Sequence, residues 1–210
     1  MARYTEAKCR LCRRVGDELM LKGERCFTAK CTFERRSTPP GYSASARLRR
    51  KKSDRGIQLR EKQKARYTYG IFERQFRKFF AEAMRLPGVT GENFVALLER
   101  RLDNVIYRLG FANSRSQARQ LVGHGHFLLN GHKTDIPSCL VKSGDVIAWR
   151  ERSTQTGYYK TLVEEINDRT IPGWLVLDSQ KLVGRVLNLP TQDDIEVKFD
   201  EKAIVEYYSR

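Results

Sequence analysis

The apolar residues between positions 98 and 129 change their spacing from helical to extended, which predicts a helix, a second helix and a strand. In the first helix the apolar positions recur at i, i+4, i+7, i+8 and i+11 and share one face: Leu98, Leu102, Val105, Ile106 and Leu109. Gly110 predicts the end of this helix, because glycine readily takes the left-handed conformation of a C-cap. We expect this face to be buried.

The second helix is predicted to begin at Ser114, where the side chains of Ser114 and Gln117 suit a capping box. Its apolar side consists of three residues: Ala118, Leu121 and Val122. Residues 127–129 predict a short strand, and Asn130–Gly131 suits a tight turn with positive φ. Lys133 follows this turn, so we expect it close to the second helix if the strand packs back.

The N-terminus of the second helix has the chemistry of a phosphate site. Arg115 and Arg119 are four residues apart and offer guanidinium groups beside free backbone N–H groups and the positive end of the helix dipole. On spacing alone, an ordinary helical hairpin with a solvated basic face is equally well supported. The candidate contacts of this region are Arg115, Ser116, Gln117, Arg119, Gln120, His124, His126, Asn130 and Lys133.

Residues 57–86 predict further helix, with a break at Gly70. An aromatic stripe at helical spacing is assigned to the core: Phe72, Phe76, Phe79, Phe80 and Ala83. Six cations of this segment are candidate phosphate contacts: Arg60, Lys62, Lys64, Arg74, Arg77 and Lys78. Beyond position 140, residues 146–149, 174–178 and 183–187 predict strands, residues 161–166 a helix, and residues 204–210 an apolar end held by packing.

The charge of the chain is large and uneven. The 210 residues carry a formal net charge of +15, divided as +14 over residues 1–100, +4 over residues 101–150 and −3 over residues 151–210. Such a charge indicates a polyanionic partner, because Lys and Arg that neutralise phosphates release counterions. A basic run follows the break at residues 39–41, and we expect it to lie along a phosphate backbone in preference to being a solvated loop: Arg47, Arg49, Arg50, Lys51 and Lys52.

Four of the five cysteines form two close pairs, Cys9-x2-Cys12 and Cys26-x4-Cys31. Two such pairs separated by a loop are typical of a tetrahedral zinc site. With four thiolates the coordination sphere is closed, so one structural Zn²⁺ is expected. Free structural cysteines are the second interpretation, and disulfides are disfavoured because nothing in the sequence indicates secretion. The fifth cysteine, Cys139, is assigned to the core.

No apolar run approaches the ~20 residues that a membrane helix needs, and the first residues resemble neither a signal nor a transit peptide. We therefore expect a cytoplasmic protein without a membrane partner. A nucleotide-binding loop of the form GxxxxGK[ST] is absent from the sequence. A zinc-dependent DNA-binding regulator would need a recognition helix and usually a dimer seam, and neither is visible.

Five stretches in order along the chain closely resemble the bacterial family of small-subunit ribosomal protein S-four. They are residues 9–14, residues 58–64 with Tyr69–Gly70, residues 73–77, residues 100–133 and residues 204–210. The resemblance implies an α+β, helix-rich fold with an N-terminal zinc knuckle. It also implies three parts: a zinc-binding segment at 1–44, a helical domain at 45–98 completed by about 197–210, and an RNA-binding module with a small β region at 99–196.

The resemblance implies a structural RNA-binding protein and no enzyme. Modifying and tRNA-charging enzymes share the module, but the 60 residues after it are too few for a catalytic domain. The expected partner is the 5′ domain of small-subunit rRNA, where binding would nucleate assembly. Ribosomal proteins S-three and S-five and the messenger RNA at its entrance are further expected partners, with an effect on accuracy and, in some members, repression of their own operon. No small-molecule substrate is expected.

Two departures from the family pattern limit this transfer. Residues 40–44 read Pro-Gly-Tyr-Ser-Ala, where many relatives have a His-containing stretch, so contacts of that His do not transfer. Residues 185–200 match only loosely. Many relatives also lack the full set of four cysteines, so we expect zinc to stabilise the N-terminal segment without being required for RNA binding.

Overall fold

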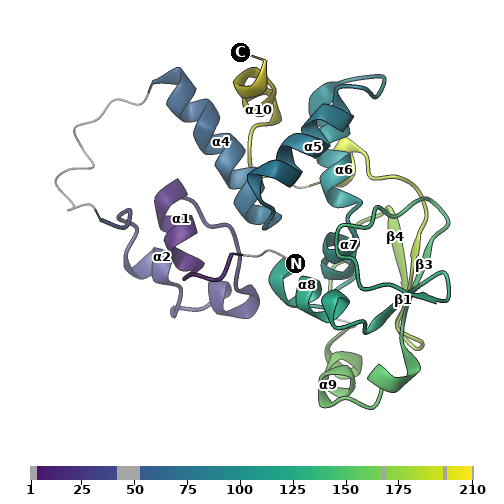
Figure 1. The fold of residues 1–210 in the computed structure, drawn as a ribbon. Coiled ribbons are helices and arrows are strands. Elements are labelled where there is room, and N and C mark those ends of the chain that lie inside the picture. The colour runs from purple at the N-terminus through teal and green to yellow at the C-terminus, as the bar shows by residue number, and fades with distance from the viewer. Residues whose placement is uncertain (1–3, 42–52, 167–168, 196–197, 210) are drawn as a thin grey trace. The chain divides into compact units, whose positions relative to one another are not determined.

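The computed structural model describes residues 4–41, 53–166, 169–195 and 198–209 (Figure 1). The chain divides into two compact units, the first formed by residues 1–95 and 197–210 and the second by residues 96–196. No helix among the described residues is long and apolar enough to cross a membrane.

The described residues of the first unit form helices joined by turns, with no strand among them. Its elements are α1 (Cys9–Val15), the 3₁₀ turn η1 (Gly23–Phe27), α2 (Thr32–Arg35), α4 (Asp54–Thr68), α5 (Glu73–Ala83), the first part of α6 (Thr90–Glu99) and α10 (Glu201–Tyr208). Ser53 caps α4, because its hydroxyl accepts the N–H of Gly56 at 3.2 Å. The break predicted at Gly70 is confirmed: α4 ends at Thr68, and Gly70 has φ +61°.

Most of the predicted aromatic stripe lies in the core of this unit. Phe76, Phe79, Phe80 and Ala83 are buried, and Phe94 of α6 packs edge-on against Phe76 with ring centroids 4.9 Å apart. The assignment of Phe72 to the core is wrong. Phe72 precedes the first turn of α5 with extended backbone (φ −87°, ψ 159°), so its side chain leaves the helical stripe and is 42% exposed.

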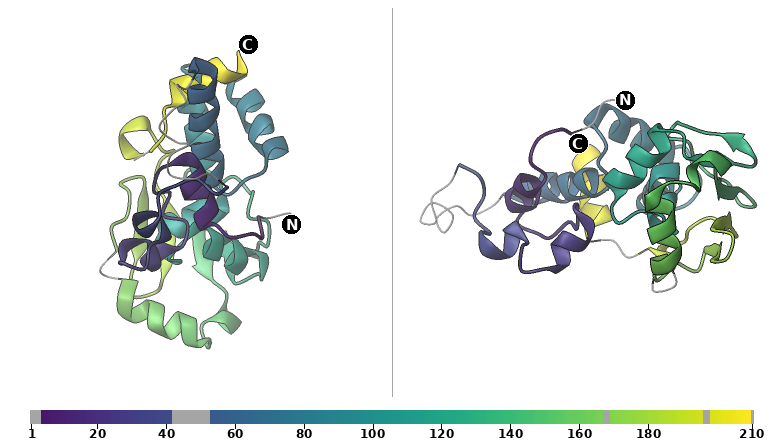
Figure 2. Two further views of the ribbon diagram at one scale, coloured as in Figure 1. Left: turned by 90° about the vertical axis from the view of Figure 1, so that its left-hand side faces the viewer. Right: turned by 90° about the horizontal axis from the view of Figure 1, so that it is seen from below.

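The C-terminal helix α10 packs against α4, and both views of Figure 2 draw it beside that helix. Gln58 donates to Glu206 at 2.8 Å, and the Tyr208 hydroxyl donates to Glu73 at 2.8 Å. Ile204 is buried, and the Tyr208 ring lies 4.6 Å from that of Phe80 between centroids. The prediction that the apolar end is held by packing is therefore confirmed for residues 204–209.

The second unit packs helices on one antiparallel sheet. After the end of α6 come α7 (Leu102–Arg108), α8 (Arg115–Gly123), β1 (Phe127–Leu129), β2 (His132–Lys133), β3 (Val146–Trp149), the turn η2 (Glu151–Ser153), α9 (Gly157–Glu165), β4 (Leu175–Asp178), β5 (Val183–Val186) and the turn η4 (Gln192–Asp194). The strand order is β2-β1-β3-β5-β4. Phe127 pairs with Trp149 across β1 and β3, and Gly184 pairs with Ile147 across β5 and β3. Residues from α7, α8, α9 and the sheet form one core.

The single helix predicted through residues 98–109 is wrong. The helix is interrupted at Arg100–Arg101. Arg101 has an extended backbone (φ −64°, ψ 135°) and forms a β-bridge with Leu140. The apolar face nevertheless survives, because all five of its predicted residues are fully buried. Two smaller differences concern boundaries: α9 begins at Gly157, capped by Thr156, and β4 begins one residue after Trp174.

Candidate nucleic-acid interface

Helix α8 carries five of the nine contacts predicted between residues 115 and 133, and its position is fixed at its first turn. The Ser114 hydroxyl accepts the N–H of Gln117 at 3.3 Å, as predicted. In a full capping box the Gln117 side chain would accept the N–H of Ser114. Here Gln117 Oε1 instead accepts the N–H of Asn113, at 2.9 Å. Arg169 adds a second restraint, since its guanidinium donates to the carbonyl of Gly110 at 2.8 Å and also contacts the Asn113 side chain. The start of α8 is thereby tied to the loop before it.

Arg119 is held by a buried carboxylate on α7. Its Nε donates to Asp103 Oδ2 at 2.7 Å, and its Nη2 lies 2.6 Å from the same oxygen. Asp103 also receives two hydrogen bonds from the buried Arg101, at 3.1 and 2.9 Å. One carboxylate thus binds two guanidinium groups, and the Arg119 side chain is only 14% exposed.

Arg115 is held in the same way by other residues of the second unit. Its Nε donates to Asn104 Oδ1 at 2.7 Å, its guanidinium lies 4.6 Å from the centroid of the Tyr107 ring, and its Nη2 lies 3.7 Å from the buried Glu99. Glu99 in turn receives two hydrogen bonds from Arg108, both at 2.9 Å. We call Glu99, Asp103, Asn104, Arg115 and Arg119 the α7–α8 network.

The α7–α8 network changes the interpretation of the two arginines. They were expected to offer their guanidinium groups to a phosphate, and both are engaged with acceptors of their own chain. Contact with phosphate remains a prediction for the outward part of each group. Sequence analysis missed the acceptors. The available signal was Asp103–Asn104, two polar residues in sequence between the apolar Leu102 and Val105; in the structure both are 2% exposed.

The outer surface of the second unit carries the more accessible candidates. Gln120, His124 and Lys133 are exposed, and Ser116 is half-buried. Lys133 lies against the end of α8, as predicted, because a Cβ built on Gly125 would come within 2.5 Å of Lys133 Cε. The His126 Nδ1 atom lies 2.9 Å from Ser153 Oγ. Burial, followed by the charge of His124, lowers the pKa of His126, so its ring stays neutral to lower pH.

The Asn130 side chain stabilises the turn between β1 and β2 through hydrogen bonds. Asn130 and Gly131 have φ +51° and +81°, which confirms the predicted tight turn. The Asn130 amide group donates to Asp145 at 2.8 Å, and its oxygen accepts the N–H of Val146 at 2.8 Å. Its side chain therefore locks the turn onto the start of β3, and contact with RNA remains untested.

The cations predicted on α4 and α5 fall into two groups. Lys62 is 4% exposed, lies 2.8 Å from Glu73 and sits over the Tyr207 ring at 4.8 Å, so it serves the packing of α4 on α5 and α10. Lys64 pairs with Asp17 at 3.1 Å and with Glu61 at 2.9 Å. Both lysines are thus engaged with carboxylates of their own chain, and their contact with phosphate stays a prediction.

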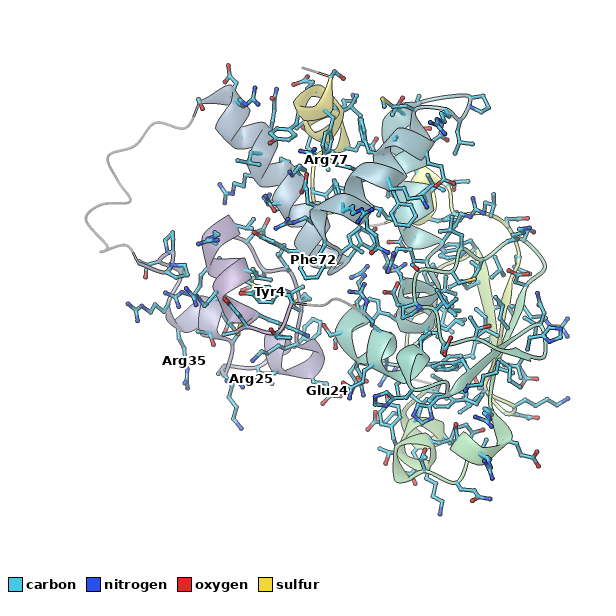
Figure 3. The ribbon with its side chains drawn as sticks, in the orientation of Figure 1. Tyr4, Glu24, Arg25, Arg35, Phe72 and Arg77 are labelled. Atoms are coloured by element: carbon cyan, nitrogen blue, oxygen red, sulfur yellow. The ribbon has the colours of Figure 1, made fainter. Side chains whose placement is uncertain are left out.

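Arg74 and Arg77 form the accessible group on α5. Arg74 is exposed, and Arg77 is 69% exposed while its Nε lies 3.3 Å from Glu73 (Figure 3). Arg60 of α4 is half-buried and donates to the carbonyl of Gly16 at 3.3 Å. The predicted contacts at Arg47, Arg49, Arg50, Lys51 and Lys52 lie outside the described residues.

The four N-terminal cysteines lie on three short elements of the first unit. Cys9 and Cys12 are on α1, Cys26 is in η1, and Cys31 precedes α2; all are free thiols. Burial raises the pKa of the Cys12 thiol, the charges of Cys26, Cys9 and Cys31 add to this, and a hydrogen bond from the Leu19 backbone opposes it. The Lys22 N–H donates to Cys26 Sγ at 3.4 Å. Over the described residues, no three His, Cys, Asp or Glu side chains are placed so that they could hold a metal ion.

In the second unit α7 and α8 pack against an antiparallel sheet, with two largely covered arginines on α8 and the exposed Lys133 on the first hairpin, an arrangement suited to an RNA-binding module. The sequence agrees: residues 100–147 match the model of the S4 domain, and residues 3–99 match that of the ribosomal protein S4/S9 N-terminal domain. The chain is 57% identical to the small ribosomal subunit protein uS4 of Dehalococcoides mccartyi, 56% to that of Pelotomaculum thermopropionicum and 52% to that of Syntrophomonas wolfei, in each case over all of both chains.

The chain therefore belongs to the uS4 family of small ribosomal subunit proteins. This family is a structural one, so the chain is a ribosomal constituent and not an enzyme.

Proposed function

We propose that this chain binds the 5′ domain of small-subunit rRNA directly and nucleates assembly of that domain in the cytoplasmic ribosome. The observation that carries the proposal is the full-length identity of 57% to a small ribosomal subunit protein, together with an S4 domain on the unit that holds α7 and α8. The charge of the chain supports it, because the net charge of +15 suits a polyanion.

The α7–α8 network suggests how the second unit supports binding. Glu99 and Asp103 orient Arg115 and Arg119 before any RNA arrives, so little side-chain entropy is lost when RNA binds. The exposed Lys133 and the outer residues of α8 then contact the phosphate backbone. In the first unit, Arg74, Arg77 and the basic run at residues 47–52 contact further phosphates.

The family resemblance adds finer proposals. We include among the partners the ribosomal proteins S-three and S-five. We also include the messenger RNA at the entry channel of the ribosome, and an effect on translational accuracy. Repression of the protein's own operon follows if the module also binds that messenger. A pull-down from assembled small subunits and a messenger-binding assay test these proposals separately.

The main test is competition binding with the full-length protein. Labelled transcripts of the 5′ domain and of the 3′ domain of small-subunit rRNA are compared, each with bulk tRNA as competitor. Binding of the 5′ domain that survives the competitor is the expected result. Equal affinity for both transcripts, abolished by tRNA, would mean that only the positive charge of the chain is acting.

We also propose that Cys9, Cys12, Cys26 and Cys31 bind one structural Zn²⁺. The donor set supports this, because four thiolates surrounded by Lys and Arg are chemically suited to zinc, and Cys12 is within electrostatic range of the other three. The side chains as described do not form a metal-ready group, so zinc would have to draw them together.

Metal analysis of the reduced, freshly purified protein tests the zinc proposal. One zinc per chain is expected, lost in Cys26→Ser and retained in Cys139→Ser, which changes a cysteine of the second unit. Absence of zinc from the wild type, or equal zinc content in the Cys26→Ser variant, would contradict the proposal.

A further inference from the structure

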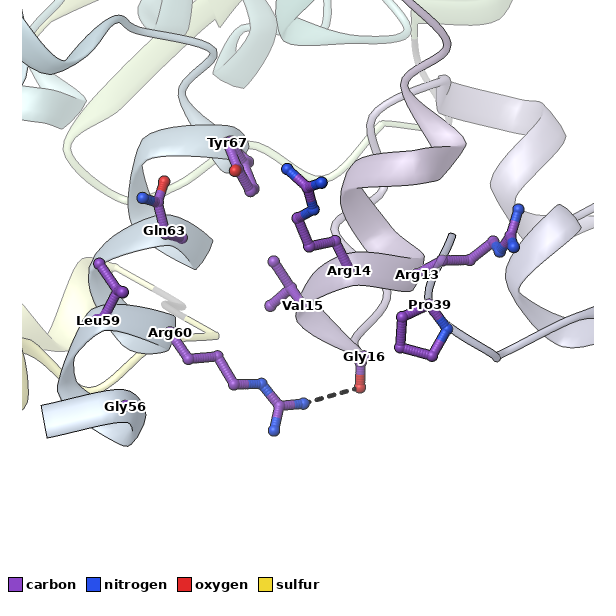
Figure 4. Close-up of a pocket in the computed structure, with 10 residues that line it drawn as sticks. All are labelled: Arg13, Arg14, Val15, Gly16, Pro39, Gly56, Leu59, Arg60, Gln63 and Tyr67. Carbon is purple, nitrogen blue, oxygen red and sulfur yellow. Dashed lines mark hydrogen bonds between the residues drawn. The ribbon is translucent and has the colours of Figure 1, made fainter. Parts of the chain in front are cut away.

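The first unit contains a pocket of about 440 Å³ between α1 and α4 (Figure 4). A volume of this size lies within the range of small-ligand pockets, roughly 300–1,000 Å³. Its lining comprises Arg13, Arg14, Val15, Gly16, Pro39, Gly56, Leu59, Arg60, Gln63 and Tyr67. None of the sequence motifs pointed to this pocket.

One face of α4 forms a wall of the pocket. Gly56, Arg60, Gln63 and Tyr67 recur at i, i+4, i+7 and i+11, which is one stripe of a helix. The buried residues Gln58, Lys62 and Ala65 fall on other positions and serve packing. The α4 residues that line the pocket thus include an aromatic ring, an amide and a guanidinium group. These residues are not the ones that α4 buries.

The pocket is cationic and contains unsatisfied polar groups. No carboxylate is among its lining residues, and within the described part of the chain no ion pair involves Arg13, Arg14 or Arg60. Arg60 reaches the Gly16 carbonyl with one Nη atom, while its buried Nε and the buried Gln63 Oε1 have no hydrogen-bond partner among the described residues. Leaving such groups unpaired costs free energy, which a polar ligand would recover.

The directions of the arginines differ. In Figure 4 the side chains of Arg14, from α1, and Arg60, from α4, lie between the two helices. Arg13 points away from α4 and donates to the carbonyl of Thr38 at 2.8 Å. Arg14 is exposed. Arg14 and Arg60 are therefore the pair that an anion in the pocket would meet, and Arg13 contributes mainly through its charge.

We propose that this pocket binds a single nucleotide of RNA. Arg14 and Arg60 bind its phosphate, since guanidinium groups match phosphate geometry. The base lies against the wall formed by Leu59 and Tyr67, with Gln63 available to its polar edge. Base stacking on aromatic side chains and a basic groove are the usual means of holding single-stranded RNA. The proposal rests on the proposed function and identifies an additional contact in the first unit.

Affinity of the full-length protein for the 5′-domain transcript tests the pocket. Arg14→Gln and Arg60→Gln should each weaken binding roughly tenfold or more, as expected for the loss of a hydrogen bond to a charged group. Arg85→Gln is the matched control, because Arg85 is exposed, loses the same charge and does not line the pocket. Gln63→Leu removes no charge, so it should weaken binding while the salt dependence stays unchanged.

Crosslinking of the wild-type protein gives a first readout that needs no variant. A transcript containing 4-thiouridine is irradiated with the wild-type protein, and crosslinked peptides are identified by mass spectrometry. Crosslinks within residues 13–16 or 59–67 are expected, and they should disappear in the Arg60→Gln variant but remain in Arg85→Gln.

The outcomes separate the pocket from the wider function. If the wild type does not distinguish the 5′ domain from tRNA, the proposed function fails. If it does, but the pocket variants bind like Arg85→Gln and neither segment crosslinks, the pocket proposal alone fails. Tight binding of adenosine monophosphate, with transcript affinity unaffected by the pocket variants, would assign the pocket to a free nucleotide and contradict the RNA proposal.

Discussion

Arg119 brings two nitrogen atoms to one oxygen of Asp103, with Nε at 2.7 Å and Nη2 at 2.6 Å. The Asp103 side chain is 3% exposed, and Arg101 donates to both oxygens of the same carboxylate. This contact joins α8 to α7 across sixteen residues of sequence. The orientation of the candidate interface therefore depends on a carboxylate that RNA itself cannot reach directly.

Replacing Asp103 by Asn should destabilise the second unit. The change leaves Arg101 and Arg119 without their buried counter-charge, which costs about 3–5 kcal/mol when one partner of a buried pair is removed. Both tryptophans, Trp149 and Trp174, are buried in this unit, so urea unfolding followed by tryptophan fluorescence reports on it. Asp135→Asn, at an exposed position, is the control. Equal unfolding free energies for the two variants would show that the carboxylate is not structurally important.

Gly184→Ala should also destabilise the second unit. A Cβ at this position would lie 2.4 Å from Leu109 Cδ1, in the core between β5 and α7. Overpacking of this kind costs about 1–3 kcal/mol. Gly157→Ala at the start of α9 meets nothing within 4 Å and is the matched control. The same fluorescence measurement applies, and a Gly184→Ala variant as stable as the control would contradict the close packing of β5 on α7.

The stability of the first unit should depend on pH through Glu73. Burial acts to raise the pKa of Glu73, but hydrogen bonds from Lys62 and Tyr208 and the charges of Lys62 and Arg66 outweigh it, so its pKa lies below the ordinary value of 4.5. A lowered folded-state pKa means that the stabilisation is present above about pH 4.5 and is lost as the pH falls through the folded value.

The test compares wild type with Glu73→Gln by urea unfolding, followed by far-UV circular dichroism, between neutral pH and pH values below the folded pKa. The variant should be less stable at neutral pH, and the difference should shrink as the medium becomes acidic. A difference that stays constant or grows under acid would contradict the assigned direction. Glu82→Gln, on the same helix, is a suitable control, because no ion pair of Glu82 is found among the described residues.

Exposed and buried lysines should behave differently towards RNA. Lys133→Gln should reduce the slope of log affinity against log salt concentration by roughly 0.7–0.9 if it removes one phosphate contact. Lys181→Gln, which is exposed in the turn between β4 and β5, should leave the slope unchanged. Lys62→Gln should instead lower the stability of the first unit, because Lys62 is paired with Glu73. A slope change for Lys62→Gln at unchanged stability would reverse this assignment.

Much of the fold follows from spacing that the sequence displays directly. The break at Gly70, the turn at Asn130–Gly131 and the strands near Phe127 and Trp149 depend on local patterns, and each is present. The split at Arg101 was not predictable in this way. Leu98 and Leu102 keep helical spacing across the break, and the bridge from Arg101 to Leu140 is a long-range contact.

The site was predictable in position but not in its electrostatics. Spacing placed Arg115 and Arg119 on one helix face, yet their acceptors Asn104 and Asp103 lie 11 and 16 residues earlier. Lys62 shows the same limit, because the Tyr208 hydroxyl that shares Glu73 with it comes from the far end of the chain. Charge alone does not reveal whether a cation faces RNA or a carboxylate of its own protein.

The most direct test of the account is hydroxyl-radical footprinting of naked small-subunit rRNA with the purified full-length protein and bulk tRNA as competitor. Protection confined to the 5′ domain, unchanged by the competitor, is the predicted result. The Asp103→Asn variant should lose part of this protection, whereas Asp135→Asn should keep it. Diffuse protection along the whole rRNA that tRNA abolishes would contradict specific binding and leave only the attraction between a basic chain and a polyanion.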